Sequence, residues 1–159
     1  MRLNLLLLCG IVLMFSGCAQ PQTSGPGASP KFHILENGEP SAITVQHCLI
    51  GFVGSVPGKT IRRSQEAAAE LAAQLLEKAK AGEDFDAIVK AYTNDSPPGI
   101  YQMANSGLPA DSRAEVYSRD KMVPAFGNVG FKLEVGEYGM SAHDPQASPF
   151  GWHIIKRLK

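Results

Sequence analysis

The fold is decided by a stretch of ten residues, Phe150-Gly151-Trp152-His153-Ile154-Ile155-Lys156-Arg157-Leu158-Lys159. Isoleucine and tryptophan at its centre favour a β-strand. Successive side chains of a strand point to opposite faces. One face is therefore expected to carry Trp152, Ile154, Lys156 and Leu158, and the other His153, Ile155 and Arg157. The stretch predicts a half-buried strand that holds a histidine.

A second predicted strand lies far upstream and also holds a histidine. It reads Ile43-Thr44-Val45-Gln46-His47-Cys48-Leu49-Ile50. The same alternation places Ile43, Val45, His47 and Leu49 on one face and Thr44, Gln46 and Cys48 on the other. Shorter strands are expected near Tyr101–Ala104 and Tyr138–Ser141.

Two helices are predicted between the long strands. The first is capped by Ser64, runs through Lys80 and stops at Gly82,. Its apolar face consists of Ala68, Leu71, Ala72, Leu75 and Ala79,. The second runs from about Asp84 to Tyr92, with Phe85, Ile88, Val89 and Tyr92 on one side,. One strand, two or three helices and then three strands indicate an α+β fold with a small, largely antiparallel sheet.

Four phrases resemble the parvulin family of peptidyl-prolyl cis/trans isomerases. They are Arg63-Ser64-Gln65-Glu66-Ala67, Ala81-Gly82-Glu83-Asp84-Phe85, Met122-Val123-Pro124-Ala125-Phe126 and Phe150-Gly151-Trp152-His153-Ile154-Ile155. No single phrase is decisive, but their order and spacing match the family from about Ile43 to Leu158. The resemblance implies a parvulin-like domain over residues 42–159, with a four-stranded, mostly antiparallel sheet surrounded by three or more helices.

The resemblance also implies a set of site residues. His47 and His153 match the paired active-site histidines of the family, and Asp95 matches a nearby position that holds Cys or Asp. These three are the catalytic candidates. The substrate-binding candidates are Met122, Phe126 and Phe150, which would grip a proline ring, Tyr101, where the family prefers Leu, and Ser148, near a hydroxyl-bearing position that orients one histidine. The family needs no cofactor and no metal.

Simpler explanations exist for each candidate taken alone. A histidine in an apolar strand is usually a structural residue, and Asn94-Asp95-Ser96-Pro97 is also good turn chemistry,. Met122 and Phe126 lie at i and i+4 and are compatible with an ordinary core. The chain also departs from the family in two places. The loop after Asp95 is shortened, with Gly99 as its only matching glycine, and the segment Asn105–Asp120 is long, with a helix-capable stretch at Asp111–Tyr117.

The first residues are predicted to be a targeting signal rather than part of the folded domain. Arg2 precedes an apolar run from Leu5 to Phe15, which is too short for a comfortable membrane span,. Phe15-Ser16-Gly17-Cys18 resembles the lipobox of bacterial lipoproteins. It predicts a signal peptide over residues 1–17 and lipidation of Cys18, and therefore an exported domain anchored to the cell envelope. An ordinary secretory signal that releases a soluble protein is the alternative.

Residues 18–41 are expected to be the lipidated cysteine followed by a flexible tether. Their Pro, Gly and Ser residues offer little apolar surface to offset the entropy of ordering,. Lys31–Leu35 is open to two interpretations, an added edge strand or the approach to a turn at Glu36–Pro40. With Cys9 in the signal and Cys18 lipidated, Cys48 is left alone as a small buried residue. Without lipidation, Cys18 would be available for a disulfide with Cys48 or another chain.

Composition and spacing argue against several other functions. Fifteen basic and fifteen acidic residues cancel, so nothing in the charge indicates a nucleic-acid partner,. The histidines are scattered without metal-ligand spacing, and the nucleophile turn of a serine hydrolase is missing. Lys59, Arg62 and Arg63 fall where phosphate-selective parvulins keep a basic cluster, but the two arginines also match the entry phrase of the first helix.

Two functions follow from the sequence. The first is a monomeric, lipid-anchored isomerase that assists the folding of exported proteins by rotating X–Pro bonds of proline-containing polypeptides. The second is a catalytically weak parvulin-like domain that binds extended polypeptide as a chaperone or adaptor. The candidate site residues favour the first, and the shortened loop favours the second.

Overall fold

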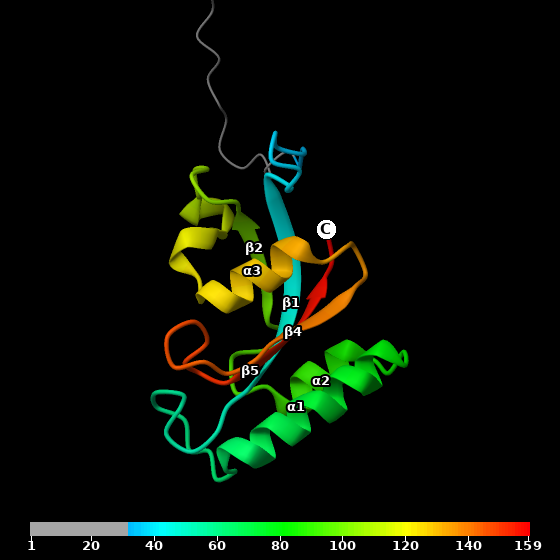
Figure 1. The fold of residues 1–159 in the computed structure, drawn as a ribbon, viewed down its shortest axis with the longest axis vertical. Coiled ribbons are helices and arrows are strands. Elements are labelled where there is room, and N and C mark those ends of the chain that lie inside the picture. The colour runs from blue at the N-terminus through cyan, green and yellow to red at the C-terminus, as the bar shows by residue number, and fades with distance from the viewer. Residues whose placement is uncertain (1–31) are drawn as a thin grey trace, which may run out of the picture.

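A computed structural model describes residues 32–159. Its centre is a five-stranded sheet in the order β3-β2-β1-β5-β4 (Figure 1). The strands are β1 Ala42–Ile50, β2 Ile100–Ala104, β3 Val116–Ser118, β4 Tyr138–Ser141 and β5 Trp152–Arg157. The helices are α1 Gln65–Lys80, α2 Phe85–Tyr92 and α3 Pro124–Lys132, with short 3₁₀ turns at Ser112–Ala114 and Arg119–Lys121. The predicted α+β class is confirmed.

The sheet has five strands, where the resemblance implied four. The additional strand, β3, pairs with β2 in parallel, while every other pairing is antiparallel. Within the helix-capable stretch Asp111–Tyr117, only a single 3₁₀ turn forms, at Ser112–Ala114, and Asp111 caps it. Glu115 then adopts a left-handed conformation with φ 54°, which ends the turn and sends the chain into β3,. A strand of three residues is too short to show a recognisable alternation of apolar and polar residues in the sequence.

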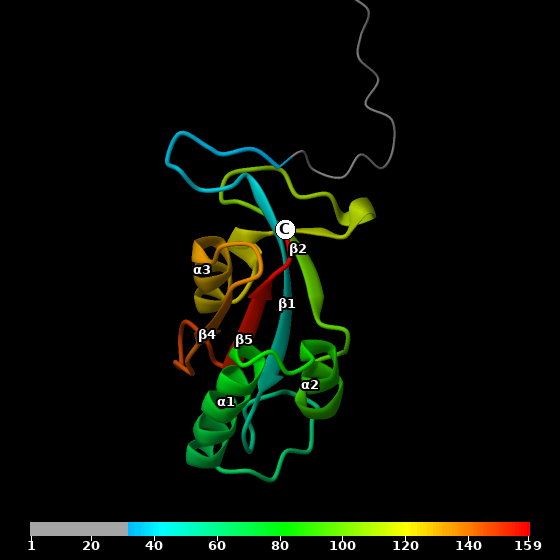
Figure 2. The ribbon, with the colours of Figure 1, turned by 90° about the vertical axis from the view of Figure 1, so that its right-hand side faces the viewer.

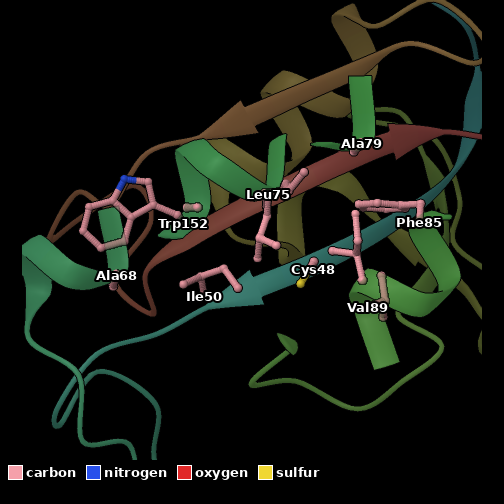
Figure 3. Close-up of a cluster of buried hydrophobic side chains, with 11 residues drawn as sticks. Cys48, Ile50, Ala68, Leu75, Ala79, Phe85, Val89 and Trp152 are labelled. Atoms are coloured by element: carbon pink, nitrogen blue, oxygen red, sulfur yellow. The ribbon is translucent and has the colours of Figure 1, made fainter. Parts of the chain in front are cut away.

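Both faces of the sheet are buried, whereas the C-terminal stretch was expected to form a half-buried strand. Cys48 and Ile50 of β1 lie with Trp152 and Ile154 of β5 in a core under α1 and α2 (Figure 3). Ile43 and Val45 lie with Ile155 on the other face, in a second core under α3. Figure 2 shows α3 well separated from the α1 and α2 pair along the sheet. By the same alternation His47 and His153 belong to the α3 face.

The two predicted helices form close to their expected limits. The Ser64 hydroxyl accepts a hydrogen bond from the amide of Ala67 at 3.2 Å and so caps α1,. Asp84 caps α2 in the same way through the amide of Asp86. The predicted apolar faces are buried except at Leu71, which is partly buried, and Tyr92, which is exposed at the end of α2.

Helix α3 covers the second core and comes very close to the sheet. It begins with Pro124 at its first turn, a position where the missing amide proton costs nothing,. A Cβ atom on Gly130 would lie 3.1 Å from the side chain of Ile43, so a small residue is needed where the helix crosses β1. This approach presses Phe126 of α3 against His47, with ring centres 5.0 Å apart.

Residues 32–41 form a turn beside the sheet rather than a further strand of it. Its backbone is closed by an isolated bridge between Ile34 and Pro40 and by the Leu35 amide, which donates to Glu39 O at 2.8 Å. Of the two interpretations of Lys31–Leu35, the turn is therefore the correct one for the described part. The Glu39 carboxylate pairs with Arg119 at 2.9 Å.

The predicted signal peptide, Cys18 and most of the tether lie outside the described residues. Within residues 32–159, no helix is long and apolar enough to span a bilayer.

Candidate functional site

The two histidines meet although they are 106 positions apart in the chain. His47 on β1 and His153 on β5 lie on neighbouring strands, and their Nδ1 atoms are 3.2 Å apart. The ring planes differ by 18° and the ring centres are 5.3 Å apart, so the rings meet edge to edge, nitrogen to nitrogen. Both side chains are almost fully buried. A hydrogen bond between two imidazole nitrogens requires that one ring donates and the other accepts.

Asp95 joins the opposite side of His47. Its Oδ2 atom lies 2.9 Å from Nε2 of His47 and also accepts a hydrogen bond from the Tyr101 hydroxyl at 2.9 Å. The hydrogen bond from His47, assisted by the one from Tyr101, holds the pKa of Asp95 well below its ordinary value. Burial and the hydrogen bond to Asp95 raise the pKa of Tyr101 in turn. At neutral pH this corner of the site is therefore a carboxylate held by two donors.

Burial determines the protonation state of His153. Removal from solvent, together with the neighbouring His47, lowers its pKa to about 3. His153 is therefore neutral under ordinary conditions and bears one ring proton. The neutral His153, the carboxylate-bound His47 and the negatively charged Asp95 together give the site a polar floor.

Two glycines allow loops to approach β1 closely, one at His47 and one at Ile50. Gly99 has φ 66°, and a Cβ atom there would lie 2.5 Å from the carbonyl oxygen of His47. The amide of His47 donates to Gly99 O at 2.9 Å, so this contact anchors the loop after α2 to β1. Gly151 has φ 132°, and a Cβ atom there would lie 2.2 Å from Ile50 O. Only glycine satisfies both the dihedral angles and the space at these positions.

A cavity of about 330 Å³ opens beside the histidines. Its lining is mostly apolar and consists of Leu49, Val56, Pro57, Tyr101, Met122, Val123, Phe126 and Phe150, with His47, Asp95 and His153 as the polar groups. The ring of Phe126 forms part of its wall, with ring centres 5.5 Å from His153 and 6.0 Å from Tyr101. A small apolar pocket with a few convergent polar groups is the usual form of a ligand site.

The structure brings seven of the eight predicted site residues to this cavity. They are His47, Asp95, Tyr101, Met122, Phe126, Phe150 and His153. Ser148 is fully buried outside the lining, where its hydroxyl donates to Gly151 O at 2.8 Å. It shapes the turn before β5, and no hydrogen bond joins it to His47 or His153 among the described residues.

Four lining residues were not predicted. Leu49 shares the face of His47 by strand alternation, and that signal was available in the sequence,. Val123 belongs to the phrase that supplied Met122 and Phe126. Val56 and Pro57 come from the loop between β1 and α1, where no period in the sequence indicates which side chains turn inward.

The basic residues of that same loop do not line the cavity. The guanidinium group of Arg63 donates to Gly51 O at 3.3 Å and to Asn94 Oδ1 at 2.9 Å, and so ties the loop to the end of α2. Lys59 and Arg62 are exposed. Arg63 therefore has a structural role, and the loop turns apolar side chains toward the pocket. Within residues 32–159 no group of three or more His, Cys, Asp or Glu side chains is placed to hold a metal ion.

Known proteins resemble the chain in sequence. The family described as the PPIC-type PPIASE domain matches residues 32–159. "Foldase protein PrsA 4" of Bacillus cereus is 34% identical over 85 residues, which are 54% of this chain and 26% of the relative. "Chaperone SurA" of Pseudomonas fluorescens is 32% identical over 96 residues, which are 60% of this chain and 20% of the relative. The matched segments thus span about a quarter or less of either relative.

Solved structures resemble the chain in fold. The peptidyl-prolyl isomerase ESS1 from Candida albicans aligns with a TM-score of 0.57 at 20% identity, over 80% of this chain and 66% of the other. The solution structure of TbPIN1 aligns with a TM-score of 0.53 at 18% identity, over 75% of this chain and 98% of the other. At such identities the likeness supports the fold alone.

Proposed function

Because the chain belongs to the family of PPIC-type, or parvulin-type, peptidyl-prolyl isomerase domains, we propose that it assists the folding of exported proteins by rotating X–Pro bonds at the pocket beside His47. The observation that carries this proposal is the convergence of His47, His153 and Asp95 on one apolar cavity. The relatives named as a foldase and a chaperone support a role in protein folding. The substrates are proline-containing polypeptides.

The chemistry required of the site is modest. Rotation about a peptide bond crosses a barrier of about 18–20 kcal/mol, because amide resonance must be broken. Unassisted X–Pro rotation takes roughly tens to hundreds of seconds. An acceleration of about a thousandfold requires only about 4 kcal/mol of preferential binding to the twisted amide. A pocket that holds the ring in a fixed polar environment is sufficient for that.

Each part of the pocket has a role in this mechanism. Phe126, Met122 and Phe150 hold the proline ring, so that the preceding carbonyl rotates past the polar side of the cavity. There His47 and Asp95 set the electrostatic field that favours the twisted amide. Asp95 already accepts two hydrogen bonds through Oδ2, and no covalent step is needed. Bond rotation neither forms nor breaks a bond, which is consistent with a site that lacks a free nucleophile.

The first experiment compares kcat/KM on a proline-containing peptide for the wild type and Phe126→Ala. We expect Phe126→Ala to lose most activity, because the aromatic wall that holds the proline ring is gone. Phe131→Ala is the matched control, since Phe131 is a buried residue of the same helix that packs against Arg119 outside the cavity. Truncating a buried Phe costs about 3–5 kcal/mol, so both variants must be folded at the assay temperature. A wild type no faster than the uncatalysed rate, or a folded Phe126→Ala as active as wild type, contradicts the proposal.

The polar side of the pocket is tested in the same assay. Asp95→Ala removes the charged acceptor of His47, and His153→Ala removes its ring partner. We expect both to lower kcat while the apolar grip on the ring, and hence KM, changes less. A selective rise of KM with unchanged kcat would instead assign these groups to ground-state binding.

The shortened loop between α2 and β2 favours a second function, the binding of polypeptide without catalysis. If the folded wild type binds unfolded polypeptide but does not accelerate X–Pro rotation, the domain acts as a polypeptide-binding chaperone or adaptor. A refolding assay on a substrate limited by proline isomerisation distinguishes the two functions. A binding protein slows or leaves unchanged the slow folding phase, whereas an isomerase shortens it.

We also propose that Cys18 carries a lipid that anchors the domain to the cell envelope, the outer membrane in a Gram-negative host because Ala19 rather than Asp follows. The short apolar run and the Phe15-Ser16-Gly17-Cys18 phrase support this,. A Cys18→Ser protein is expected to lose metabolic labelling with fatty acid and to leave the membrane fraction. Retention of both properties would refute the anchor.

A further inference from the structure

Two buried side-chain atoms of the described residues lack a hydrogen-bond partner, Oγ of Ser141 and Nε2 of His153. Both residues are nearly sealed from solvent, with exposed fractions of 3% and 4%. A polar atom buried without a partner is costly, and nearly all such atoms in proteins are satisfied. Two of them in one place indicate an interaction that concerns both.

The two atoms belong to residues that face each other across the sheet. Ser141 on β4 pairs directly with His153 on β5, and directly paired residues of antiparallel strands project from the same face,. Strand β5 lies between β1 and β4. Nδ1 of His153 is turned toward His47 on β1. The opposite edge of the imidazole, which bears Nε2, therefore lies on the side of β4 and Ser141.

The ring protons of the site can be assigned from its acceptors. The Asp95 carboxylate can only accept, so Nε2 of His47 carries the proton between them,. A neutral imidazole bears one ring proton, so Nδ1 of a neutral His47 is then an acceptor. Nδ1 of His153, which lies 3.2 Å away, must donate to it. This leaves Nε2 of His153 as an unprotonated acceptor that needs a donor.

Ser148, which the parvulin resemblance placed near such a role, is not that donor. Its hydroxyl has one proton, and that proton is given to Gly151 O at 2.8 Å,. The Ser141 hydroxyl has no such commitment.

We propose that Ser141 is a positioning residue of the isomerase site, whose hydroxyl donates through one bridging water to Nε2 of His153 and thereby fixes the proton of His153 on Nδ1. The chain of hydrogen bonds then runs from Ser141 through His153 and His47 to Asp95, across three strands and the loop after α2. The catalytic consequence rests on the function proposed above. The hydrogen bond itself does not.

The test measures the tautomer of His153 by long-range ¹H–¹⁵N correlation on histidine-labelled protein. In the wild type we expect the proton on Nδ1 and a hydrogen-bonded, unprotonated Nε2. In Ser141→Ala the Nε2 signal should move toward that of a free nitrogen, and kcat/KM should fall by about fivefold, the effect of one net hydrogen bond. Ser141→Thr retains a hydroxyl and should restore both. Ser148→Ala is the matched control, a buried serine whose loss should leave the tautomer of His153 unchanged.

Three results would overturn the proposal. The first is a wild type with the proton of His153 on Nε2, a measurement that does not depend on any variant folding. The second is a folded Ser141→Ala with unchanged His153 signals. The third is an equal effect of Ser148→Ala and Ser141→Ala on those signals. A wild type with the expected tautomer but no isomerase activity would support the hydrogen bond while it refutes the proposed function, so the two failures are distinguishable.

Discussion

The surroundings of Asp95, His153 and Cys48, single residues in and near the site, shift their pKa values in different directions or for different reasons. Asp95 remains accessible through a side chain that is 32% exposed, and its hydrogen bonds favour the charged form. His153 is sealed, and burial favours its neutral form. Cys48, next to His47 in sequence, points to the other face of the sheet, and burial raises the pKa of its thiol to about 12. Neighbours along a strand thus have unrelated chemistry, because alternate side chains enter different environments.

The lowered pKa of His153 predicts how stability depends on pH. The pKa is about 3 in the native state and about 6.5 in an unfolded chain,. Between these values the unfolded chain binds more protons, so the free energy of unfolding falls as pH is lowered from about 6.5, by up to about 1.4 kcal/mol per pH unit. Asp95, whose native pKa is also lowered, adds a further loss only below its ordinary value of 3.8,.

Urea unfolding at neutral pH and at about pH 5 checks this prediction. His153→Gln should flatten the dependence, because the group that titrates on unfolding is gone. His143→Gln is the control for losing a histidine elsewhere in the same β4–β5 region. An equal loss of stability on acidification in wild type and His153→Gln would contradict the assignment.

At the scale of elements, the loop between β1 and α1 determines what surrounds the pocket. Val56 and Pro57 line the cavity, whereas Arg63 is held by Gly51 and Asn94 at the loop's base. An anionic group next to the proline would meet apolar side chains there and lose hydration without gaining a partner. We therefore expect the loop to favour an apolar residue before proline over an acidic or phosphorylated one.

Peptides that differ only in the residue before proline test this preference. We expect kcat/KM to be about tenfold higher for Leu–Pro than for Glu–Pro or phosphoserine–Pro, since one uncompensated charge costs at least that much. Val56→Lys should narrow the difference by supplying a cation at the rim. Val53→Lys adds the same charge at an exposed position of the loop outside the lining and should leave the preference unchanged. A wild type that prefers the phosphorylated peptide would show that Lys59 or Arg62 reaches the substrate.

At the scale of the whole molecule, β1 is the central strand, and it contacts the neighbouring strands and the helices on both faces of the sheet. It pairs with β2 on one side and β5 on the other, presents one face to α1 and α2, and presents the other to α3. The turn at residues 32–41 is joined to this framework by Glu39, which lies 2.9 Å from Arg119 and 3.1 Å from the amide of Asn105. Arg119 also stacks over the ring of Phe131 at 4.5 Å. The turn is therefore connected to the core under α3 through Arg119 and to the end of β2 through Asn105.

This connection predicts the effect of shortening the chain. A protein beginning at residue 32 should unfold cooperatively with full stability, whereas one beginning at residue 40 should lose about 1 kcal/mol, because Arg119 keeps its other contacts but loses its carboxylate,. Glu39→Gln in the longer protein is the matched control and should reproduce most of that loss. Urea unfolding of the three proteins provides the comparison. A loss above about 2 kcal/mol that Glu39→Gln does not reproduce would mean that Phe32–Leu35 itself contributes to the core.

The sequence determined the features that depend on neighbours along the chain. The alternation of β1 and β5, the caps at Ser64 and Asp84 and the prolines after α2 are local, because backbone geometry repeats every two or 3.6 residues,. Resemblance to parvulins then supplied the pocket residues, since the matching phrases keep their order.

Only the tertiary structure decided which residues become partners across the fold. It placed Val56 and Pro57 in the pocket, added β3, paired Glu39 with Arg119 and set Ser141 rather than Ser148 opposite His153. Ser141 and His153 are 12 positions apart, Glu39 and Arg119 are 80 apart, and β3 has only three residues. No local period in the sequence indicates which side chains become partners across such separations.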